Sequence, residues 1–443
     1  MAEVYPRRAL SLILRQEEGK DCCVIPDGAI EGGGIYLNEP AKEVLLHCDG
    51  SSDIDALAGK FETRYSGSSR EEIKEGVIST IEQLVDFGLV DLRREPCASC
   101  EVTEKKAQLS LELVYFEVTR ACNLRCIHCY NEAGVKREKE LKTEEILRII
   151  ESLAQAGVVD VVLTGGEPFI RKDIFTIIKA IKDNKMRFSV FTNGILISPA
   201  IAAELAAYEP RFVAISLDGA EAKIHEKIRG RSTFDKTVRA IKMLKSNGIK
   251  VRINHTLTLE STAQLGGFMK LMGELGVDDV YFDRFDSLGR GKEHAGMVIP
   301  VERGSEIKSI IDKYSREENV PVMNYSPKVN IIEADDGNMC GVGLSSCYIK
   351  ANGEMSFCPV MSAEEFTVGN VLENSVALLW NSGKWNSLRG ATADTIAGCK
   401  ECPGKSICLG GCKAKAYNEF GSFSHPDRWS CFQLKNLFAD KNN

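Results

Sequence analysis

Between residues 111 and 330, the spacing of hydrophobic and polar positions alternates between two periods. Short apolar runs such as "LELVYFEVT" and "VVDVVLTGG" are typical of buried strands, whereas "TEEILRIIESLAQAG" has the spacing of an amphipathic helix. Six strands alternate with helices through short connections, which predicts a parallel sheet. Because crossovers between parallel strands are right-handed, the sheet should curl, and we predict an α/β fold with a partial (β/α)6 barrel.

Residues 1–95 have a different pattern, which predicts a small winged-helix-like α+β domain. "ALSLILRQ" and "CCVIP" are expected to pair as short strands, and three helical patterns follow them. The third helix, "SREEIKEGVISTIEQLVDFG", begins with Ser69 and Glu72 at the spacing of a capping box and should end at Gly88. Its apolar face consists of Ile73, Val77, Ile81 and Leu84.

The remaining boundaries follow from composition. Residues 96–110, "PCASCEVTEKKAQLS", are polar and are predicted to form a linker to the barrel domain of residues 111–330. In residues 331–443, helical patterns become sparse while Gly, Ser and Cys become frequent. This C-terminal domain therefore needs another source of order, which metal clusters could supply.

Charge and composition exclude several classes of function. The chain has 56 basic and 63 acidic residues, a formal balance of −7, which disfavours a nucleic-acid partner held through phosphates. Residues 1–95 hold 11 basic and 19 acidic residues, so the winged-helix-like domain is not expected to bind DNA. The start of the chain lacks the apolar core of a signal peptide, and no apolar run reaches membrane-spanning length. We therefore expect a cytoplasmic protein without a membrane partner.

The 16 cysteines do not suit a disulfide framework in a long chain without a secretion signal, so metal binding is the more natural role. Cys122, Cys126 and Cys129 follow the first barrel strand in "CNLRCIHCY", with C-x3-C-x2-C spacing. Iron–sulfur cubanes are usually held by four thiolates, so three thiolates leave one iron open. The alternative is a zinc ion with His128 as fourth ligand, but His128 is poorly placed to share a metal with the adjacent Cys129.

This loop resembles the signature of the radical S-adenosylmethionine (SAM) enzymes, and the resemblance covers about residues 111–330. It implies that the three cysteines hold a [4Fe-4S] cluster whose open iron binds SAM. Reductive cleavage of SAM would then yield a 5′-deoxyadenosyl radical that abstracts a hydrogen atom from the substrate.

The same resemblance implies five contacts to SAM. Gly166 and Glu167, in "GGEP" after the second strand, would hold the methionine ammonium group. Ser216, at the end of the fourth strand, would contact the ribose or the carboxylate, and Arg229 would pair with the carboxylate. His128 would contact the adenine. Without the resemblance, a plain turn, helix capping and surface charge explain "GGEP", Ser216 and Arg229 equally well.

Eight cysteines lie in the C-terminal domain, which is the number that two four-thiolate sites need. They are Cys340, Cys347, Cys358, Cys399, Cys402, Cys408, Cys412 and Cys431. Gly353 permits a hairpin turn that brings Cys358 back, and the C-x2-C pair places two thiolates within reach of one metal. Two structural zinc sites are the alternative.

The spacing of these eight cysteines resembles the SPASM extension of radical SAM enzymes. The resemblance implies two auxiliary [4Fe-4S] clusters with interleaved ligands. The first would be bound by Cys340, Cys347, Cys358 and Cys412, and the second by Cys399, Cys402, Cys408 and Cys431. Fully ligated clusters suit electron relay better than substrate binding.

The stretch "YLNEPAKEVLLHCDGSSDIDALAGKF" resembles the PqqD-like peptide-recognition module. Such modules bind the leader of a precursor peptide by adding it as a strand to a sheet edge. The alternative is a winged-helix domain that only packs on the barrel. Cys97 and Cys100 could bind metal or form a redox pair, although incidental thiols explain them as well.

Together the resemblances imply a radical SAM maturase that binds a precursor peptide through residues 1–95 and oxidises or cross-links one of its side chains. An external reductant such as flavodoxin or ferredoxin would supply electrons. A maturase of a haem-type tetrapyrrole or metallocofactor, a sulfatase-type maturase and a non-enzymatic iron–sulfur scaffold or peptide-binding protein remain open. The sequence does not identify the catalytic acid or base. Asp283, Arg284 and Asp286, at the end of the sixth strand, could face the substrate or form a salt-bridged rim.

Overall fold

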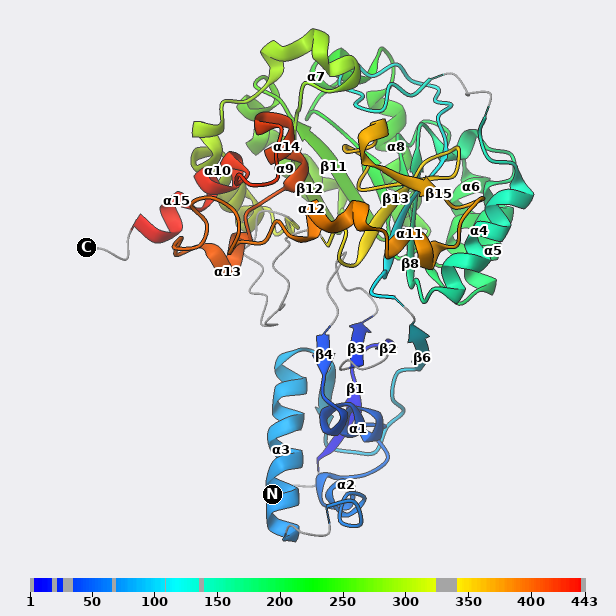
Figure 1. Cartoon of the computed structure of the whole chain (residues 1–443), viewed down its shortest axis with the longest axis vertical. Coiled ribbons are helices and arrows are strands. Elements are labelled where there is room, and N and C mark those ends of the chain that lie inside the picture. The colour runs from blue at the N-terminus through cyan, green and yellow to red at the C-terminus, as the bar shows by residue number, and fades with distance from the viewer. Residues whose placement is uncertain are drawn as a thin grey trace. The chain divides into compact units, whose positions relative to one another are not determined.

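The computed structural model describes residues 4–17, 22–26, 35–65, 69–107, 109–134, 139–323 and 341–439. The chain divides into two compact units, Met1–Ser110 and Leu111–Asn443, and each is described by itself. Figure 1 labels helices and strands of both units where there is room. In the described residues, no helix is long and apolar enough to cross a membrane.

In its described residues, the first unit combines two small sheets with three helices. The larger sheet has the order β4 (Ile35–Leu37), β3 (Cys22–Pro26), β2 (Leu12–Glu17) and β6 (Val102–Ala107). The smaller one pairs β1 (Tyr5–Arg8) with β5 (Val90–Arg93). The helices are α1 (Glu39–His47), α2 (Ile54–Gly59) and α3 (Arg70–Asp86). The predicted pairing of the two segments that form β2 and β3 is confirmed, and these strands pair antiparallel.

Helix α3 is the element that the sequence predicted in most detail. Ser69 and Glu72 form the capping box, and Gly88 follows the helix with a φ of 68°. The predicted apolar face is buried and consists of Ile73, Val77, Ile81 and Leu84. Each such side chain contributes about 1.5–3 kcal/mol when it is fully buried, so this face anchors the helix on the core of the first unit.

Strand β6 lies within the segment that was expected to be a linker. It pairs in parallel with β2, from Leu12 opposite Val102 to Glu17 opposite Ala107. Its sequence, "VTEKKA", is too polar to predict a strand, but charged residues are common on edge strands, where they discourage pairing with other chains. Part of residues 96–110 therefore belongs to the sheet, and the boundaries at residues 95, 110 and 330 stay predictions.

The second unit is built on one nine-stranded sheet. The six strands of the barrel are parallel and are neighbours in chain order: β7 (Leu113–Thr119), β8 (Asp160–Gly165), β9 (Arg187–Thr192), β10 (Val213–Ser216), β11 (Val251–Leu257) and β12 (Asp279–Arg284). The first and last of these strands do not pair in the described residues, so the barrel is open, as the prediction of a partial barrel requires.

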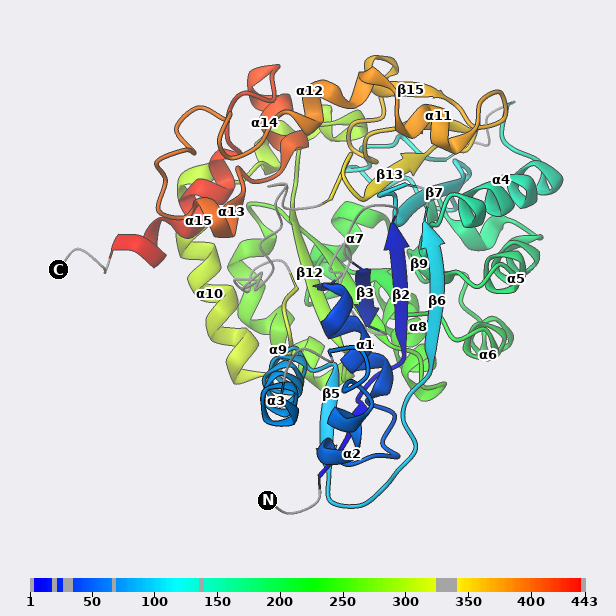
Figure 2. The same ribbon diagram turned by 60° about the horizontal axis from the view of Figure 1, so that its bottom comes forward.

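Helices follow the strands of the barrel. They are α4 (Thr143–Gln155), α5 (Ile174–Asp183), α6 (Pro199–Ala207), α7 (Ala222–Arg229), α8 (Phe234–Ser246), α9 (Leu265–Leu275) and α10 (Gly304–Glu317). Figure 2 shows α4, α5 and α6 along the outer side of the sheet. Because α7 is short and highly charged, the sequence analysis did not predict it.

The C-terminal segment extends the barrel sheet, which the sequence analysis did not predict. Strand β13 (Ser346–Ile349) pairs in parallel with β7, and β14 (Glu354–Ser356) and β15 (Thr367–Asn370) follow antiparallel. Gly353, with a φ of 85°, makes the predicted hairpin turn between β13 and β14. The remaining helices are α11 (Val376–Trp380), α12 (Asn386–Arg389), α13 (Lys405–Cys408), α14 (Lys413–Phe420) and α15 (Arg428–Ala439).

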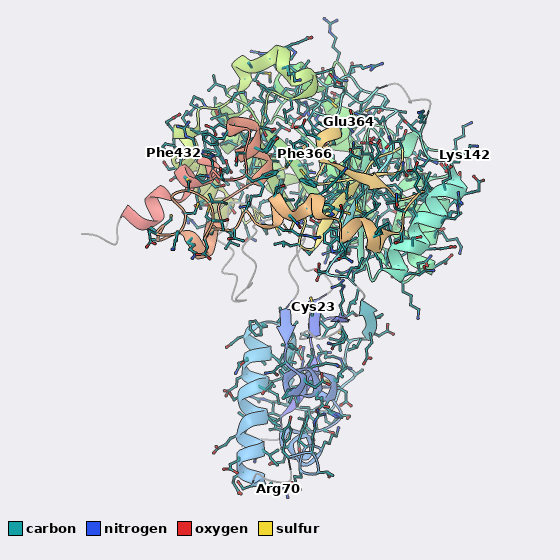
Figure 3. All side chains as sticks on the ribbon, in the orientation of Figure 1. Cys23, Arg70, Lys142, Glu364, Phe366 and Phe432 are labelled. Atoms are coloured by element: carbon teal, nitrogen blue, oxygen red, sulfur yellow. The ribbon has the colours of Figure 1, made fainter. Side chains whose placement is uncertain are left out.

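An aromatic cluster provides part of the order in this segment. Phe357 stacks on Trp385 with ring centroids 4.9 Å apart, and Phe366, which Figure 3 labels, meets the edge of Tyr417 at 5.0 Å. Tyr417 in turn lies 4.9 Å from Phe423. Aromatic pairs of this kind add about 0.5–1.5 kcal/mol each beyond their buried area, so side-chain packing orders the C-terminal segment together with any metal cluster.

Candidate functional site

The three-cysteine loop leaves the carboxyl end of β7, where functional residues of parallel barrels gather. Its base is closed by two backbone hydrogen bonds, from Cys122 N to the Gly134 carbonyl (3.0 Å) and from Gly134 N to the Arg120 carbonyl (2.8 Å). Burial raises the pKa of the Cys122 thiol to about 11, and the sulfur atoms of Cys126 and Cys129 add to that rise. The three predicted thiols thus act on one another electrostatically, and their convergence on one cluster stays a prediction.

The "GGEP" loop lies directly against the base of the cysteine loop. Gly166 N donates to the Thr119 carbonyl at 2.8 Å, and Glu167 N donates to the Ala121 carbonyl at 2.9 Å. A Cβ atom on Gly166 would lie only 2.1 Å from the Ala121 carbonyl oxygen. Glycine at this position therefore allows the backbones of two loops to touch.

The Glu167 carboxylate is fully buried and joins the ends of two strands. It accepts hydrogen bonds from the Thr192 hydroxyl (2.8 Å), Asn193 N (2.8 Å) and Phe169 N (3.2 Å). Burial raises the pKa of Glu167 to about 7, although these donors favour the charged form. The carboxylate thus holds the loop after β8 against the end of β9, and its predicted contact with an ammonium group stays a prediction.

Asn193 follows the end of β9, where it makes a turn and contacts the cysteine loop. Its side-chain oxygen accepts from Ile195 N at 3.0 Å, which is the geometry of a local turn. Its side-chain nitrogen donates to Asn123 Oδ1 at 2.8 Å and lies 3.9 Å from Cys122 Sγ. The end of β9 is therefore tied to the cysteine loop.

Asp218 is a site residue that the sequence analysis missed. Arg229 Nε donates to Asp218 Oδ2 at 2.5 Å, and Asp218 Oδ1 accepts from Thr256 N at 2.8 Å. The same guanidinium lies 3.3 Å from His128 Nε2 and 3.9 Å from Cys126 Sγ. An acidic residue just beyond the end of a barrel strand, in "SLDG", was the available signal.

Burial and ion pairing determine the charges of Asp218, Arg229 and His128. Burial alone would raise the pKa of Asp218, but Arg229 and His128 hold it well below its usual range. Burial lowers the pKa of His128 to about 4. At neutral pH the site therefore contains an Asp218–Arg229 ion pair beside a neutral imidazole.

Burial and neighbouring sulfur atoms raise the pKa values of two C-terminal thiols, Cys408 and Cys431. Burial raises the pKa of Cys408 to about 12 and that of Cys431 to about 11. The sulfur atoms of Cys431 and Cys399 act on Cys408, and those of Cys399 and Cys402 act on Cys431. These four residues are the set that the resemblance assigned to the second auxiliary cluster.

The first auxiliary set is only partly described. Cys347 is buried on β13, Cys358 follows β14, and Cys412 precedes α14, whereas Cys340 lies outside the described residues. In the described part of the chain, no three His, Cys, Asp or Glu side chains converge as a single metal ion would require. Both assignments of auxiliary ligands therefore stay predictions.

Three family models match the chain. The Radical SAM superfamily matches residues 116–272, the iron-sulfur cluster-binding domain (SPASM) matches residues 340–403, and coenzyme PQQ synthesis protein D (PqqD) matches residues 23–90. Mycofactocin maturase MftC of Mycobacterium tuberculosis (strain CDC 1551 / Oshkosh) is 31% identical over 309 residues, which are 68% of this chain and 78% of that protein. The chain belongs to the radical SAM superfamily. It is a radical SAM enzyme with a SPASM domain and an N-terminal PqqD domain.

Two further comparisons extend over nearly the whole chain. The antilisterial bacteriocin subtilosin biosynthesis protein AlbA of Bacillus subtilis is 25% identical over 394 residues, 87% of this chain and 85% of that protein. The crystal structure of Streptococcus suis SuiB bound to precursor peptide SuiA matches with a TM-score of 0.67 at 17% identity, over 96% of this chain and 99% of that chain. At this identity the likeness to SuiB shows the fold, and it confirms the predicted architecture.

The residues at the carboxyl end of the barrel fit the two cofactors of a radical SAM enzyme, a [4Fe-4S] cluster and SAM. Three thiols of one loop are suitable ligands for iron. In the described residues, His128 Nδ1 and Asn254 Oδ1 are buried without a hydrogen-bond partner. An unpaired buried polar atom costs about 1–3 kcal/mol, so these two atoms favour a polar ligand. Asn254 lies within β11, opposite Ser216, the last residue of β10.

The end of β12 connects the radical SAM barrel to the C-terminal segment of the chain. Asp283 forms an ion pair with Lys415 of α14 at 2.6 Å, and the Arg284 guanidinium lies 5.3 Å from the ring centroid of Trp429. Arg284 also lies 3.5 Å from Asp286, and burial raises the pKa of Asp286. Of the two interpretations of these residues, the contacts favour the salt-bridged rim.

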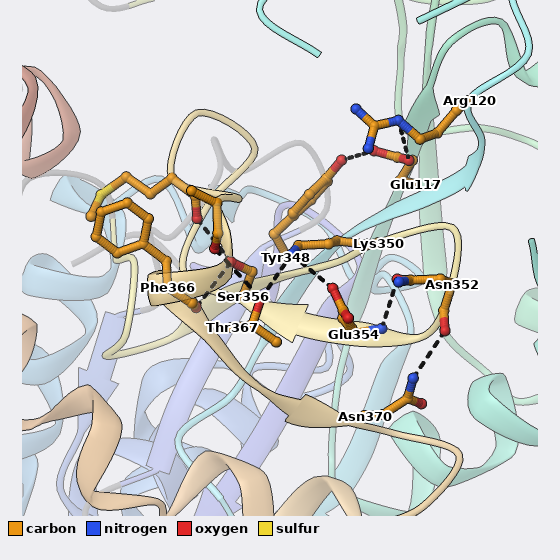
Figure 4. A network of polar contacts seen from close by, with 12 residues as sticks. Glu117, Arg120, Tyr348, Lys350, Asn352, Glu354, Ser356, Phe366, Thr367 and Asn370 are labelled. Carbon is orange, nitrogen blue, oxygen red and sulfur yellow. Dashed lines mark hydrogen bonds and ion pairs between the residues drawn. The ribbon is translucent and has the colours of Figure 1, made fainter. Parts of the chain in front are cut away.

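A second polar connection joins the two cysteine-rich regions, and Figure 4 shows it. The Tyr348 hydroxyl donates to Glu117 Oε2, which also accepts from the Asn131 side chain at 2.9 Å. Arg120 Nε lies 3.7 Å from the other Glu117 oxygen. Tyr348 follows Cys347, and Arg120 lies two residues before Cys122, so one buried carboxylate links a SPASM strand to the radical SAM loop.

Proposed function

We propose that this radical SAM enzyme is a peptide maturase that binds a precursor peptide through its N-terminal unit and oxidises or cross-links one of its side chains. One combination carries the proposal: a three-thiol radical SAM loop and a PqqD domain occur in the same chain. The name of AlbA refers to bacteriocin biosynthesis and that of MftC to mycofactocin maturation, which supports a substrate of this class.

The cofactors would be held by the residues that the sequence singled out. Cys122, Cys126 and Cys129 would bind the [4Fe-4S] cluster that carries SAM. The SAM contacts would be made by His128, Gly166, Glu167, Ser216 and Arg229. When bound, these cofactors supply a 5′-deoxyadenosyl radical, which removes a hydrogen atom from the substrate. The protein fixes the orientation of the reactants and excludes water.

The C-terminal thiols would hold two auxiliary [4Fe-4S] clusters. Cys340, Cys347, Cys358 and Cys412 would bind the first, and Cys399, Cys402, Cys408 and Cys431 the second. The mutual influence of the latter four thiols supports their assignment to one cluster. Oxidation of a side chain removes a second electron, which an auxiliary cluster can accept. A reductant such as flavodoxin or ferredoxin in a reducing, cytoplasmic compartment would return the radical SAM cluster to its active state.

The leader of the precursor would bind by strand addition to the first unit. In the larger sheet β6 occupies the outer side of β2, so the sheet ends at β4 on one side and at β6 on the other. Backbone hydrogen bonds along a free edge tolerate many leader sequences. The excess of acidic residues in residues 1–95 favours a leader with basic residues.

The test is an anaerobic reaction of the reconstituted chain with reductant, SAM and a small peptide encoded beside its gene, followed by mass spectrometry. The proposal predicts release of 5′-deoxyadenosine together with loss of hydrogen from the peptide. A chain without residues 1–110 should still cleave SAM but should modify the peptide far more slowly. The proposal would be contradicted if the protein cleaved SAM and modified an added tetrapyrrole but changed the mass of no neighbouring peptide.

A further inference from the structure

The segment Gly289–Met297, which follows β12, contacts the radical SAM loop through Arg290. Arg290 Nε donates to the Cys126 carbonyl at 2.9 Å, and its Nη1 donates to the Ala133 carbonyl at 2.9 Å. Its backbone N–H donates to the Cys129 carbonyl at 3.1 Å. A single residue therefore satisfies three carbonyl groups that are spread along the loop.

The residue before it allows this approach. Gly289 has a φ of 51°, and a Cβ atom there would lie 2.4 Å from the Tyr130 carbonyl oxygen and 2.6 Å from that of Cys129. No side chain fits into such a space, because both neighbouring atoms belong to the backbone. This segment and the cysteine loop are thus in direct backbone contact.

The chemistry of the guanidinium suits this position. Its planar fork of donors can reach two carbonyl groups at fixed angles, whereas a lysine ammonium acts as a single point. The side chain also places a permanent positive charge against a loop that carries three potential thiolates. Groups that orient metal ligands without touching the metal typically change metal affinity or activity by about 10- to 100-fold when they are removed.

We propose that Arg290 is a positioning residue, which holds the loop from Cys122 to Gly134 in its cluster-binding form before iron is bound and retains the cluster afterwards. This role rests on the proposed function only in that the loop must hold the radical SAM cluster. Gly289 has a supporting role, since the absence of a side chain lets its backbone contact the loop beside the hydrogen bonds of Arg290.

Two pairs of variants in the full-length chain test the proposal. Arg290→Met removes both side-chain hydrogen bonds, and Lys292→Met removes an exposed charge from the same segment, Gly289–Met297. Gly289→Ala forces the two backbones apart, and Gly296→Ala adds the same methyl group where no heavy atom lies within 4 Å. Arg290→Lys keeps the charge but not the planar fork.

The first measurement is hydrogen exchange in the iron-free protein. Arg290→Met and Gly289→Ala should accelerate exchange in residues 122–134 and leave α4 unchanged, which also shows that the variants are folded. The two control variants should match the wild type. Wild-type protection of residues 122–134 in both test variants would overturn the proposal, whether or not the chain is a peptide maturase.

The second measurement is the rate at which a chelator removes the radical SAM cluster after reconstitution with ferrous iron and sulfide. That cluster is identified as the electron paramagnetic resonance signal that Cys126→Ala lacks. Arg290→Met should lose it about 10- to 100-fold faster than the wild type, and Arg290→Lys should be intermediate. Equal rates in Arg290→Met and the wild type would overturn the retention role. Absence of the signal from the wild type would instead contradict the proposed function, and the exchange measurement would still decide the role of Arg290 in the loop.

Discussion

The radical SAM loop and the SPASM domain are both rich in cysteine, but they are held in different ways. The loop rests on regular structure, since Glu167, Asn193 and Arg290 join it to the segments that follow β8, β9 and β12. The SPASM domain has short helices, a hairpin and an aromatic cluster around Phe357 and Trp385. A loop that the protein itself holds in place does not need a fully ligated cluster, so one iron can stay free for a small molecule. A segment with little regular structure instead gains order from clusters in which the protein ligates every iron.

The largest expected effect is a difference in SAM cleavage between variants of the radical SAM loop cysteines and variants of the C-terminal cysteines. Cys126→Ala should abolish cleavage of SAM, because the loop then offers two thiolates, and iron content should fall from about twelve to about eight per chain. Cys402→Ala, at an exposed cysteine of the proposed second auxiliary set, should lower iron content but retain cleavage of SAM. Iron analysis and quantification of 5′-deoxyadenosine check both variants. Equal loss of cleavage in both variants would show that the two regions do not differ in this way.

Removal of iron should affect the two regions unequally. A chelator should raise hydrogen exchange in residues 393–431 about tenfold or more, because clusters there would replace regular structure as the source of order. The loop of residues 122–134 should change less, since its hydrogen bonds to neighbouring strand ends do not depend on iron. Mass spectrometry of exchanged peptides provides the comparison, and a greater change in the loop than in the SPASM domain would contradict it.

The ion pair of Asp218 with Arg229 should matter far more than the rim pair of Asp283 with Lys415. Asp218→Asn leaves a buried guanidinium without its counter-charge and should cost about 3–5 kcal/mol of stability. Asp283→Asn breaks a pair whose carboxylate side chain is 52% exposed, and it should cost less than about 1 kcal/mol. Denaturant unfolding of both variants measures the difference, which should vanish if the Asp218 pair is as solvated as the rim pair.

The same pair predicts a pH dependence. The pKa of Asp218 is held below its usual value of 3.8, so the folded state binds its proton less readily than the unfolded state. The stabilisation is therefore complete above about pH 4 and is lost as the pH falls towards the folded-state pKa. Acid unfolding of Asp218→Asn should be less steep in this range than that of the wild type. If Asp218→Asn and the wild type unfold identically as the pH falls, another group controls acid unfolding.

A smaller effect is expected at Glu167. Glu167→Gln would turn an amide N–H₂ group towards Asn193 N or Phe169 N, both of which are donors, and should cost about 1–3 kcal/mol. The same substitution at the exposed Glu144 of α4 should cost less than about 0.5 kcal/mol. Thermal unfolding measures both, and a Glu167→Gln cost as small as that of the control would mean that this carboxylate does not hold the loop.

The features that were predicted correctly are those that local sequence determines. The capping box of Ser69 and Glu72, the turn at Gly353 and the six barrel strands each depend on a few neighbouring residues or on one period of hydrophobic positions. The spacing of Cys122, Cys126 and Cys129 likewise placed three thiols in one loop, and their joint binding of a cluster stays a prediction.

The features that were missed depend on partners far away in sequence. The pairing of β13 with β7 joins residues more than 200 positions apart, and no local pattern encodes it. Nothing in the local sequence distinguishes Arg290 from a surface arginine, because its carbonyl partners lie in the distant cysteine loop. Asp218 could have been recognised by its place at a strand end, but its pairing with Arg229 required α7, a short helix with little apolar pattern.

The central claim is that only the three-cysteine loop leaves an iron open. The most direct test adds SAM to the reduced, reconstituted protein and follows the electron paramagnetic resonance signals of its clusters. The signal that is absent from Cys126→Ala should change on addition of SAM, and the signals that remain in that variant should not. A change in the remaining signals, or none in the wild type, would contradict the account.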